Sequence, residues 1–121
     1  MSKLDALMAR GTDFLGSRVA IMAGAMSWIS ERHLVSAMSN AGGFGVIAGG
    51  AMPPEILSAE IAATKAMTNK PFGVNLTFLP VVDQPDYPGM VKAIIEGGVK
   101  VVETAGNNPQ SVLPFLKDAG I

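Results

Sequence analysis

The residues best suited to bind a ligand lie in PFGVNLTFLP, residues 71–80, where an amide and a hydroxyl interrupt an apolar run. In an extended strand, side chains two residues apart share a face, which puts Gly73, Asn75 and Thr77 on one side. If this strand lines a barrel, both groups can hydrogen-bond the polar edge of a ring, and an unpaired one would cost about 1–3 kcal/mol. The alternative is that Asn75 and Thr77 bond only to neighbouring loop backbone.

Two other segments could contribute to the same site. In AGAMSW, which follows the first apolar run, Ala23, Gly24 and Ala25 are small enough to let the backbone approach a flat ligand. A tight strand-to-helix turn would use the same residue types, so this pattern alone fits both interpretations. Glu103 closes the predicted fourth strand and could reach the same place, although an acid there often only caps the following turn.

Motifs for other chemistries are absent. The single histidine, His33, stands beside Arg32 in the first turn of an amphipathic segment, which favours a solvated side chain over a catalyst. NAGGFGVIAGG lacks the G-x-G-x-x-G spacing, and its first glycine pair precedes a strand, so it is no dinucleotide fingerprint. There is no P-loop, H-E-x-x-H or nucleophile elbow, and no cysteine for a thiolate site, so we predict no metal.

The elements that must position these residues recur every 25 to 28 residues. Short apolar runs predict strands over 19–22, 44–48, 72–79 and 99–103. Segments with helical spacing follow them: one capped by Ser30 and ended by Gly42, one opened by Pro53, one over 86–96, and one from near Ser111 with Pro114 in its first turn. The side chains expected to face inward are Leu34, Val35, Met38 and Ala41, then Ile56, Ala59, Ala63 and Met67, then Met90, Val91, Ile94 and Ile95.

Alternating strands and helices imply parallel strands that are joined by helical crossovers and covered on both faces. A doubly wound open sheet of four or five strands could close within 121 residues. A (β/α)8 TIM barrel needs roughly 250, so this chain would hold about its first four βα units. Periodicity does not choose between them. In both architectures ligands bind at the carboxyl ends of the strands.

Composition narrows the class of protein. The 121 residues suffice for one domain, 49% are apolar, and the net charge of −1 offers no basic face for nucleic acid. Residues 1–18 carry charges throughout, unlike a signal peptide, and no run of about 20 apolar residues predicts a membrane span. These features and the lack of cysteine fit a cytoplasmic protein.

The sequence also resembles a known family. IMAGAMSWISERHLVSAMSNAGGFGVIAGG, followed by MTNKPFGVNLTFLP, is similar to the nitronate monooxygenases, formerly called 2-nitropropane dioxygenases, and the likeness covers nearly all of 19–121. These FMN-dependent TIM barrels include NADH:quinone reductases and flavin-type enoyl-ACP reductases. The resemblance implies the barrel, with 1–121 as the N-terminal half of a single FMN-binding domain. VKVVETAGNNP leans toward the quinone-reductase and nitronate-oxidising branch.

The resemblance also implies a cofactor site. Carried over residue by residue, the family's FMN contacts fall on Gly24, Ala25, Met26 and Ser27 in the first turn and on Asn75 and Thr77 in the third strand. Glu103, at the same mouth, completes the predicted cofactor-binding set. The sequence departs from relatives at Ala23, where glutamine is frequent. The family's catalytic histidine would lie beyond Ile121, so no catalytic residue is assigned.

By the same resemblance, FMN accepts electrons from an alkyl nitronate or from NAD(P)H and passes them to oxygen or a quinone. The expected partners are therefore small molecules. An enoyl-ACP reductase of fatty-acid synthesis would keep FMN and change the substrate. The rival of another class is a non-catalytic module, because a half-barrel exposes edge strands and apolar faces that require a partner or self-association into an oligomer.

Overall fold

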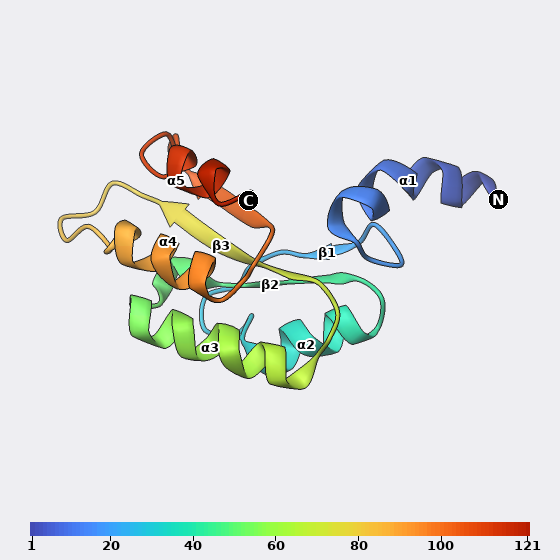
Figure 1. The fold of residues 1–121 in the computed structure, drawn as a ribbon, viewed down its shortest axis with the longest axis horizontal. Helices are drawn as coiled ribbons and strands as arrows, with labels where there is room; N and C mark the ends of the chain where they lie inside the picture. Colours follow the sequence, from blue (N-terminus) through green and yellow to red (C-terminus); the bar gives the residue numbers. More distant parts are fainter.

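The computed structural model describes residues 1–121, which alternate strands and helices after an N-terminal helix (Figure 1). In chain order the elements are α1 (Lys3–Leu15), β1 (Met22–Ala23), α2 (Arg32–Asn40), β2 (Phe44–Ile47), the short 3-10 helix η1 (Gly49–Ala51), α3 (Pro54–Met67), β3 (Phe72–Phe78), α4 (Tyr87–Glu96), β4 (Val102–Gly106) and α5 (Leu113–Asp118). None of these helices combines the length and the apolar character needed to cross a membrane.

The strands form one parallel sheet in the order β1-β2-β3-β4. A doubly wound sheet reverses its strand order at a switch point, whereas a barrel adds each strand beside the previous one. The order observed here has no reversal. The chain therefore forms a four-stranded parallel half-barrel with alternating helices, as the barrel prediction requires, and the doubly wound alternative is wrong.

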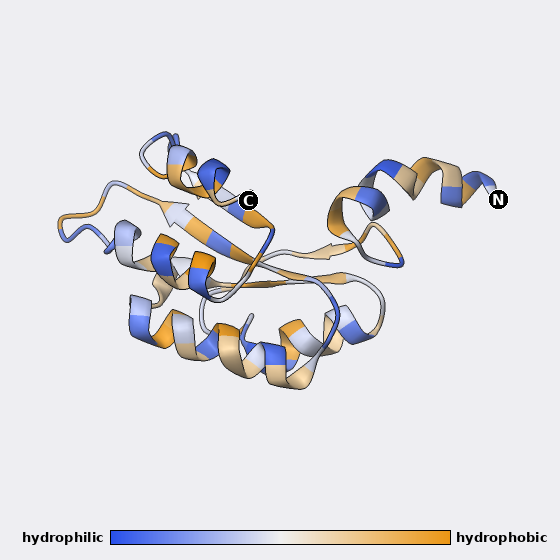
Figure 2. Ribbon diagram, viewed as in Figure 1, coloured by the Kyte–Doolittle hydropathy of each residue, from blue (hydrophilic) through white to orange (hydrophobic).

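The two faces of the sheet are packed differently. Helices α2, α3 and α4 lie along one face, where fifteen buried residues form the main core, Ile47, Val74 and Leu76 among them (Figure 1). Phe44 and Val46 alternate with Ile47 along β2, so they point to the opposite, inner face, where they form a small cluster with Leu15. Figure 2 shows β2 as hydrophobic, which is typical of a strand covered on both faces, whereas hydrophilic colour interrupts the hydrophobic β3.

Strand β3 confirms the predicted alternation. Val74 and Leu76 are fully buried in the main core, while Asn75 and Thr77 point to the inner face and bond to each other. Residues paired in a parallel ladder share a face, and Asn75 pairs with Glu103. The inner face therefore continues from β3 to β4 with all three polar side chains on it.

Strand β1 begins later than the sequence predicted. It covers Met22–Ala23 instead of 19–22, although β2 and β3 lie within one residue of their predicted bounds. The N–H of Val19 donates to the carbonyl of Gly42, in the turn before β2, at 3.0 Å. The apolar run therefore starts alongside that turn, and the ladder with β2 begins only at Met22.

Strand β4 is also displaced toward the C-terminus, covering Val102–Gly106 instead of 99–103. Val99 is 4% exposed and belongs to the main core, and its N–H donates to the carbonyl of Ile94 at the end of α4. Val99 is apolar because it packs in the main core after the end of α4, and it is not part of strand β4. Glu103 is consequently the second residue of β4 and does not close it, which corrects the prediction.

The sequence predicted Ser30 as the N-cap of helix α2, but the cap is Glu31. The Glu31 carboxylate accepts hydrogen bonds from the N–H groups of His33 and Leu34 at 2.9 and 3.2 Å. The imidazole of His33 is exposed, as expected for a solvated helix residue. Of the four side chains expected to face inward, Val35 is buried, Leu34 and Met38 are half-buried, and Ala41 is exposed.

Helix α3 buries a different face from the predicted one. Ile56 and Met67 are 45% and 41% exposed, and the buried residues are Leu57, Glu60, Ile61 and Thr64. Ala59 is exposed and Ala63 is half-buried. In α4 the prediction holds for Met90, Val91 and Ile94, while Ile95 is 38% exposed. Helix α5 carries Pro114 in its first turn, as predicted.

Helix α1 was not anticipated from the sequence. Ser2 and Asp5 form a capping box, in which the Ser2 hydroxyl accepts from the Asp5 N–H at 3.1 Å and the Asp5 carboxylate accepts from the Ser2 N–H at 2.8 Å. The helix projects from the body of the molecule (Figure 1). Only Leu15, at its C-terminal end, is buried, and it closes the inner cluster beneath Phe44.

An ion pair between α2 and α3 explains the buried acid. Glu60 accepts three hydrogen bonds from Arg32: from its backbone N–H at 2.8 Å and from its guanidinium at 2.9 and 2.6 Å. The side-chain hydrogen bonds from Arg32 lower the pKa of Glu60 and outweigh the opposing effect of burial. The two helices are thus joined at their packing surface by a charge-assisted contact.

This ion pair predicts acid sensitivity. Because the pKa of Glu60 is lower in the folded state, its stabilisation is complete above the unfolded value, about pH 4.3, and is lost as the pH falls through the folded value. In the whole protein, we expect Glu60→Gln to remove this part of the pH dependence of Tm, which appears as the pH falls below the unfolded value. Glu96→Gln, which alters an exposed pair with Lys92, is the control and should change Tm little, because exposed ion pairs contribute little to stability. Equal slopes in Glu60→Gln and the native protein would contradict the assignment.

Candidate functional site

The predicted site residues lie on the inner face between the middle of the sheet, where Asn75 pairs with Glu103, and its carboxyl edge. Asn75 and Thr77 come from β3 and Glu103 from β4, while residues 24–27 follow β1. The structure brings the three strand residues into one hydrogen-bonded row. No hydrogen bond joins that row to residues 24–27, which lie two strands away, so the site has two separate parts.

The first part is the row on β3 and β4. The Thr77 hydroxyl donates to Asn75 Oδ1 at 2.8 Å, and Asn75 Nδ2 donates to Glu103 Oε2 at 3.3 Å. Asn75 is 5% exposed, and the other two are half-buried. Neither Asn75 nor Thr77 bonds to loop backbone, so the alternative raised by the sequence is wrong. One amide N–H of Asn75 and the second carboxylate oxygen of Glu103 are left to bind a polar ligand.

Tyr87 holds the carboxyl end of β3 in place. Its hydroxyl donates to the Thr77 carbonyl at 2.7 Å, and its ring stacks on Phe78 with centroids 4.5 Å apart. Tyr87 opens α4, so this contact ties the strand end to the helix that follows it. Sequence reasoning did not include Tyr87, because the contact spans a loop and leaves no periodic signal.

The second part is the β1–α2 turn, and it is built around Ser30. This side chain is 2% exposed, and its hydroxyl accepts from the Met26 N–H at 2.9 Å and lies 3.4 Å from the Gly24 carbonyl. The Ser30 carbonyl accepts from the Ala48 N–H at the end of β2. Ser30 therefore organises the turn that holds the predicted ligand contacts, which is a different role from the helix cap assigned from the sequence.

Gly24 leaves open space at this turn. A Cβ placed there would have no heavy atom within 4 Å, whereas Ala25 packs against the inner cluster. Met26 is 48% exposed, and Ser27 is exposed too. Trp28 follows with φ of 61°, a left-handed conformation that costs a bulky residue on the order of 1–3 kcal/mol. The turn is open to a ligand and carries backbone strain.

A third segment, missed by the sequence analysis, reaches the same edge. The 3-10 helix η1 follows β2, and a Cβ on its Gly50 would lie 2.8 Å from both Cβ and Oγ1 of Thr77. Only glycine fits so close to the polar row. The pair in IAGGAM was the available signal, but it was considered only as part of a dinucleotide motif.

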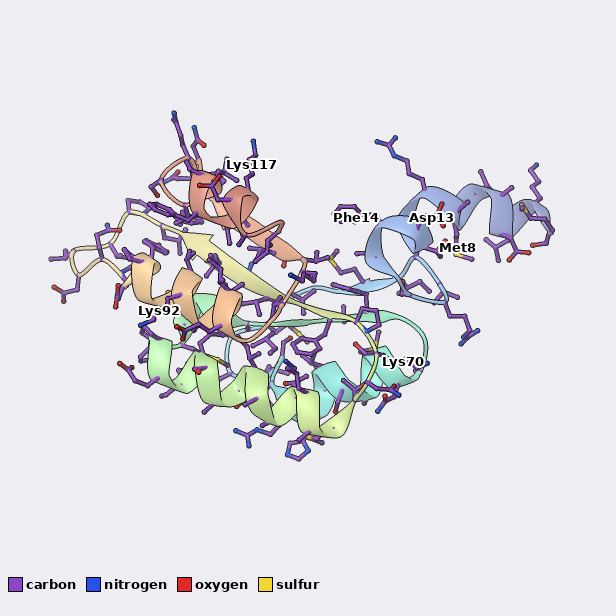
Figure 3. All side chains as sticks on the ribbon, viewed as in Figure 1. Met8, Asp13, Phe14, Lys70, Lys92 and Lys117 are labelled. Carbon is purple, nitrogen blue, oxygen red and sulfur yellow. The ribbon has the colours of Figure 1, made fainter.

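The largest hollow, about 960 Å³, lies at the opposite edge. Asp13 and Phe14 of α1 line it together with Lys70 and the segment before β4, and Figure 3 shows these labelled side chains near α1 and the start of β3. This is the amino-terminal edge, where conserved features of parallel barrels serve stability and not catalysis. The carboxyl edge, which carries the polar row, is therefore the candidate site.

Comparison with known proteins adds to this geometry. The model of the family described as nitronate monooxygenase matches residues 9–119, which is most of the chain. The chain belongs to the nitronate monooxygenase family. The match includes both parts of the candidate site and the glycine-rich η1 segment. The resemblance inferred from SNAGGFG and KPFGVNL is thereby confirmed.

Individual relatives within and around this family are similar over most of the chain. A Mycobacterium tuberculosis protein named (3aS,4S,5R,7aS)-5-hydroxy-7a-methyl-1-oxo-octahydro-1H-indene-4-carboxyl-CoA dehydrogenase is 37% identical over 109 residues, 90% of this chain and 30% of its own length. A probable nitronate monooxygenase of Staphylococcus haemolyticus is 36% identical over 69 residues, 57% of this chain and 19% of its own. The structure of FabK from Thermotoga maritima superposes with a TM-score of 0.83 and 38% identity, covering 92% of this chain and 34% of FabK. The matched segments thus span only 19% to 34% of the length of these relatives.

Proposed function

We propose that the whole protein containing this chain is an FMN-dependent oxidoreductase and that residues 1–121 form the N-terminal half of its flavin-binding barrel. The observation that supports this most directly is the polar row Thr77–Asn75–Glu103 at the carboxyl edge of an otherwise apolar inner face. Ligand sites are typically apolar surfaces with a few precisely placed polar groups, which is the pattern seen here. Membership of the nitronate monooxygenase family supports the same conclusion.

The residues present fit a flavin. Gly24 has no side chain, and a Cβ placed there would have no heavy atom within 4 Å. A flat ring can therefore approach the backbone at this position. The remaining amide N–H of Asn75 suits the carbonyl and imine acceptors of an isoalloxazine, and Glu103 holds that amide in one orientation. When bound, FMN would supply the acceptance and release of electrons. The chain itself would bind the ring, fix its orientation and limit the access of water.

For the reaction, we propose oxidation of an alkyl nitronate with O2, or the closely related reduction of a quinone by NAD(P)H. The family description and the 36% identity to a probable nitronate monooxygenase support this class. The partners would be small molecules, with neither nucleic acid nor membrane involved. The acid–base residue is not among 1–121 in this proposal, because the single histidine, His33, is exposed on α2 and makes no hydrogen bond to the polar row.

A second candidate is oxidoreduction of an acyl thioester, either enoyl-ACP reduction or a related acyl-CoA reaction. The observation that favours it is the 37% identity, over 90% of the chain, to a protein named as a carboxyl-CoA dehydrogenase. Purified whole protein can be assayed with nitroalkane anions, quinones and crotonyl thioesters side by side. Nitronate-dependent oxygen uptake supports the first class, and NAD(P)H oxidation that requires the thioester supports the second.

The absorbance of bound flavin distinguishes both proposed enzyme classes from a non-catalytic module. A flavoenzyme purifies yellow or takes up FMN on reconstitution, with the visible spectrum of bound flavin. Whole protein that shows no flavin absorbance after reconstitution with FMN would falsify the proposed function and leave the interaction module as the better account.

Gly24→Ala tests the turn. Because a Cβ there meets no protein atom, Tm should not change, while the methyl group should weaken FMN binding by roughly tenfold. Gly45→Ala is the matched control: its Cβ would lie 2.8 Å from Val35 Cα, so it should lower Tm through the contact between β2 and α2. Fluorescence titration of FMN and thermal melts provide both readouts. Unchanged FMN affinity in Gly24→Ala would remove the turn from the site.

A further inference from the structure

The β1–α2 turn exposes three large apolar side chains at the edge where ligands bind. Met26, Trp28 and Ile29 are 48%, 61% and 59% exposed. Residues 19–30 contain no charged side chain, so nothing in this segment repels an uncharged hydrocarbon. Isolated exposed apolar residues need no explanation, whereas three within four positions make this turn a candidate binding surface.

The turn that carries these side chains is held in place. The N–H groups of Ile29 and Ser30 both donate to the Met26 carbonyl, at 3.0 and 2.9 Å, and the buried Ser30 hydroxyl bonds back to the Met26 N–H. Trp28 keeps a left-handed φ of 61° within this framework, although glycine or asparagine would adopt it more readily. Strained residues cluster at binding sites, which favours a role of the Trp28 ring in binding.

We propose that Trp28, flanked by Met26 and Ile29, forms an apolar wall that binds the hydrocarbon part of the substrate and sets the preference for larger alkyl or acyl groups. This inference rests on the proposed function, because it takes the carboxyl edge as the site of reaction. The wall and the flavin turn are the same segment: Gly24 leaves space for a flat ring, and Trp28 stands four residues further on. The substrate's hydrocarbon would then lie next to the ring that Gly24 admits.

The test measures how affinity depends on chain length in the whole protein. Nitroalkanes of two, four and six carbons form one arm, and acyl N-acetylcysteamine thioesters of four, six and eight carbons form the other, with binding followed by calorimetry. A buried methylene contributes about fourfold in affinity, so the native protein should show about that slope in the arm whose head group it accepts. Trp28→Asn, which tolerates the left-handed φ but is polar, should flatten the slope, and Trp28→Phe should keep most of it.

Phe115→Ala serves as the matched control, because Phe115 is an aromatic residue with 62% exposure on α5, which follows β4 at the opposite end of the strand order from β1. It should keep the native slope. Thermal melts establish that each variant is folded. If the slope of affinity against chain length is the same in Trp28→Asn as in the native protein, the proposed apolar wall is wrong. Calorimetry detects ligand binding with or without flavin, so failure to bind FMN counts against the proposed function alone.

Discussion

In whole protein carrying Asn75→Leu, we expect FMN affinity to fall by about 1–3 kcal/mol, which is roughly 5- to 150-fold. The side chain is 5% exposed, and its amide is the member of the polar row best placed to donate to a bound ring. Leucine fills a similar volume and suits a buried strand, but it leaves the flavin's polar atom without a partner. The protein should still fold, with a lower Tm because leucine leaves the Thr77 hydroxyl and the Glu103 carboxylate without their partner, and the loss of FMN affinity should appear in a fluorescence titration.

The control for this substitution lies at the other edge of the same sheet. Ser39 is 1% exposed, donates to the Pro71 carbonyl at 2.9 Å and accepts from the Gly45 N–H at 3.2 Å. Ser39→Ala should lower Tm, because it leaves buried backbone groups unpaired, and should not change FMN affinity. If Asn75→Leu lowers Tm while binding FMN as the native protein does, Asn75 has a structural role alone.

The part of this site that could be predicted from sequence is the part with a strict period. Alternation along a strand has a period of two, so the opposite faces of Val74 and Asn75 follow from residue types alone. Helix faces are less certain, as α3 shows. An apolar-stripe interpretation leaves Glu60 in solvent, but Arg32 of another helix neutralises it and draws it into the packing surface.

Contacts between distant segments account for the other differences. Ser30 looks like a helix cap in the sequence, and its role in the β1–α2 turn appears only when the turn is folded back on it. Glu103 was predicted at the end of its strand and is its second residue. The strand begins later than predicted because Val99 packs in the main core and is not part of the strand. Gly50 and Tyr87 both contact Thr77, but each is separated from it by a connecting segment. The sequence of these segments has no periodic pattern that would predict the contacts. Predicting any of these requires the tertiary fold first.

The largest expected effect concerns residues 1–121 expressed alone, which we predict neither to fold as a stable monomer nor to catalyse. β1 and β4 each pair on one side only, so both leave a row of unpaired backbone groups. The inner face is only partly covered: its apolar cluster comprises three buried residues, against fifteen in the core beneath the helices. In a closed barrel the opposite strands would fill this space with layers of side chains.

The magnitude of this loss decides the outcome. Leu7 and Phe14 of α1 are 74% and 73% exposed, and Met22 of β1 is 42% exposed on the inner face. Burial of such area contributes about 25 cal/mol per Å², whereas a domain has a net stability of only roughly 5–15 kcal/mol. A few hundred Å² left exposed therefore removes much of this margin of stability.

The isolated segment should aggregate, associate through its edge strands or remain partly unfolded, and it should not retain FMN. Light scattering coupled to gel filtration, together with a thermal melt, tests this, with the whole protein as control. A monomer with a sharp cooperative transition would show that the four strands are self-sufficient, and the half-barrel account of the exposed faces would then be wrong.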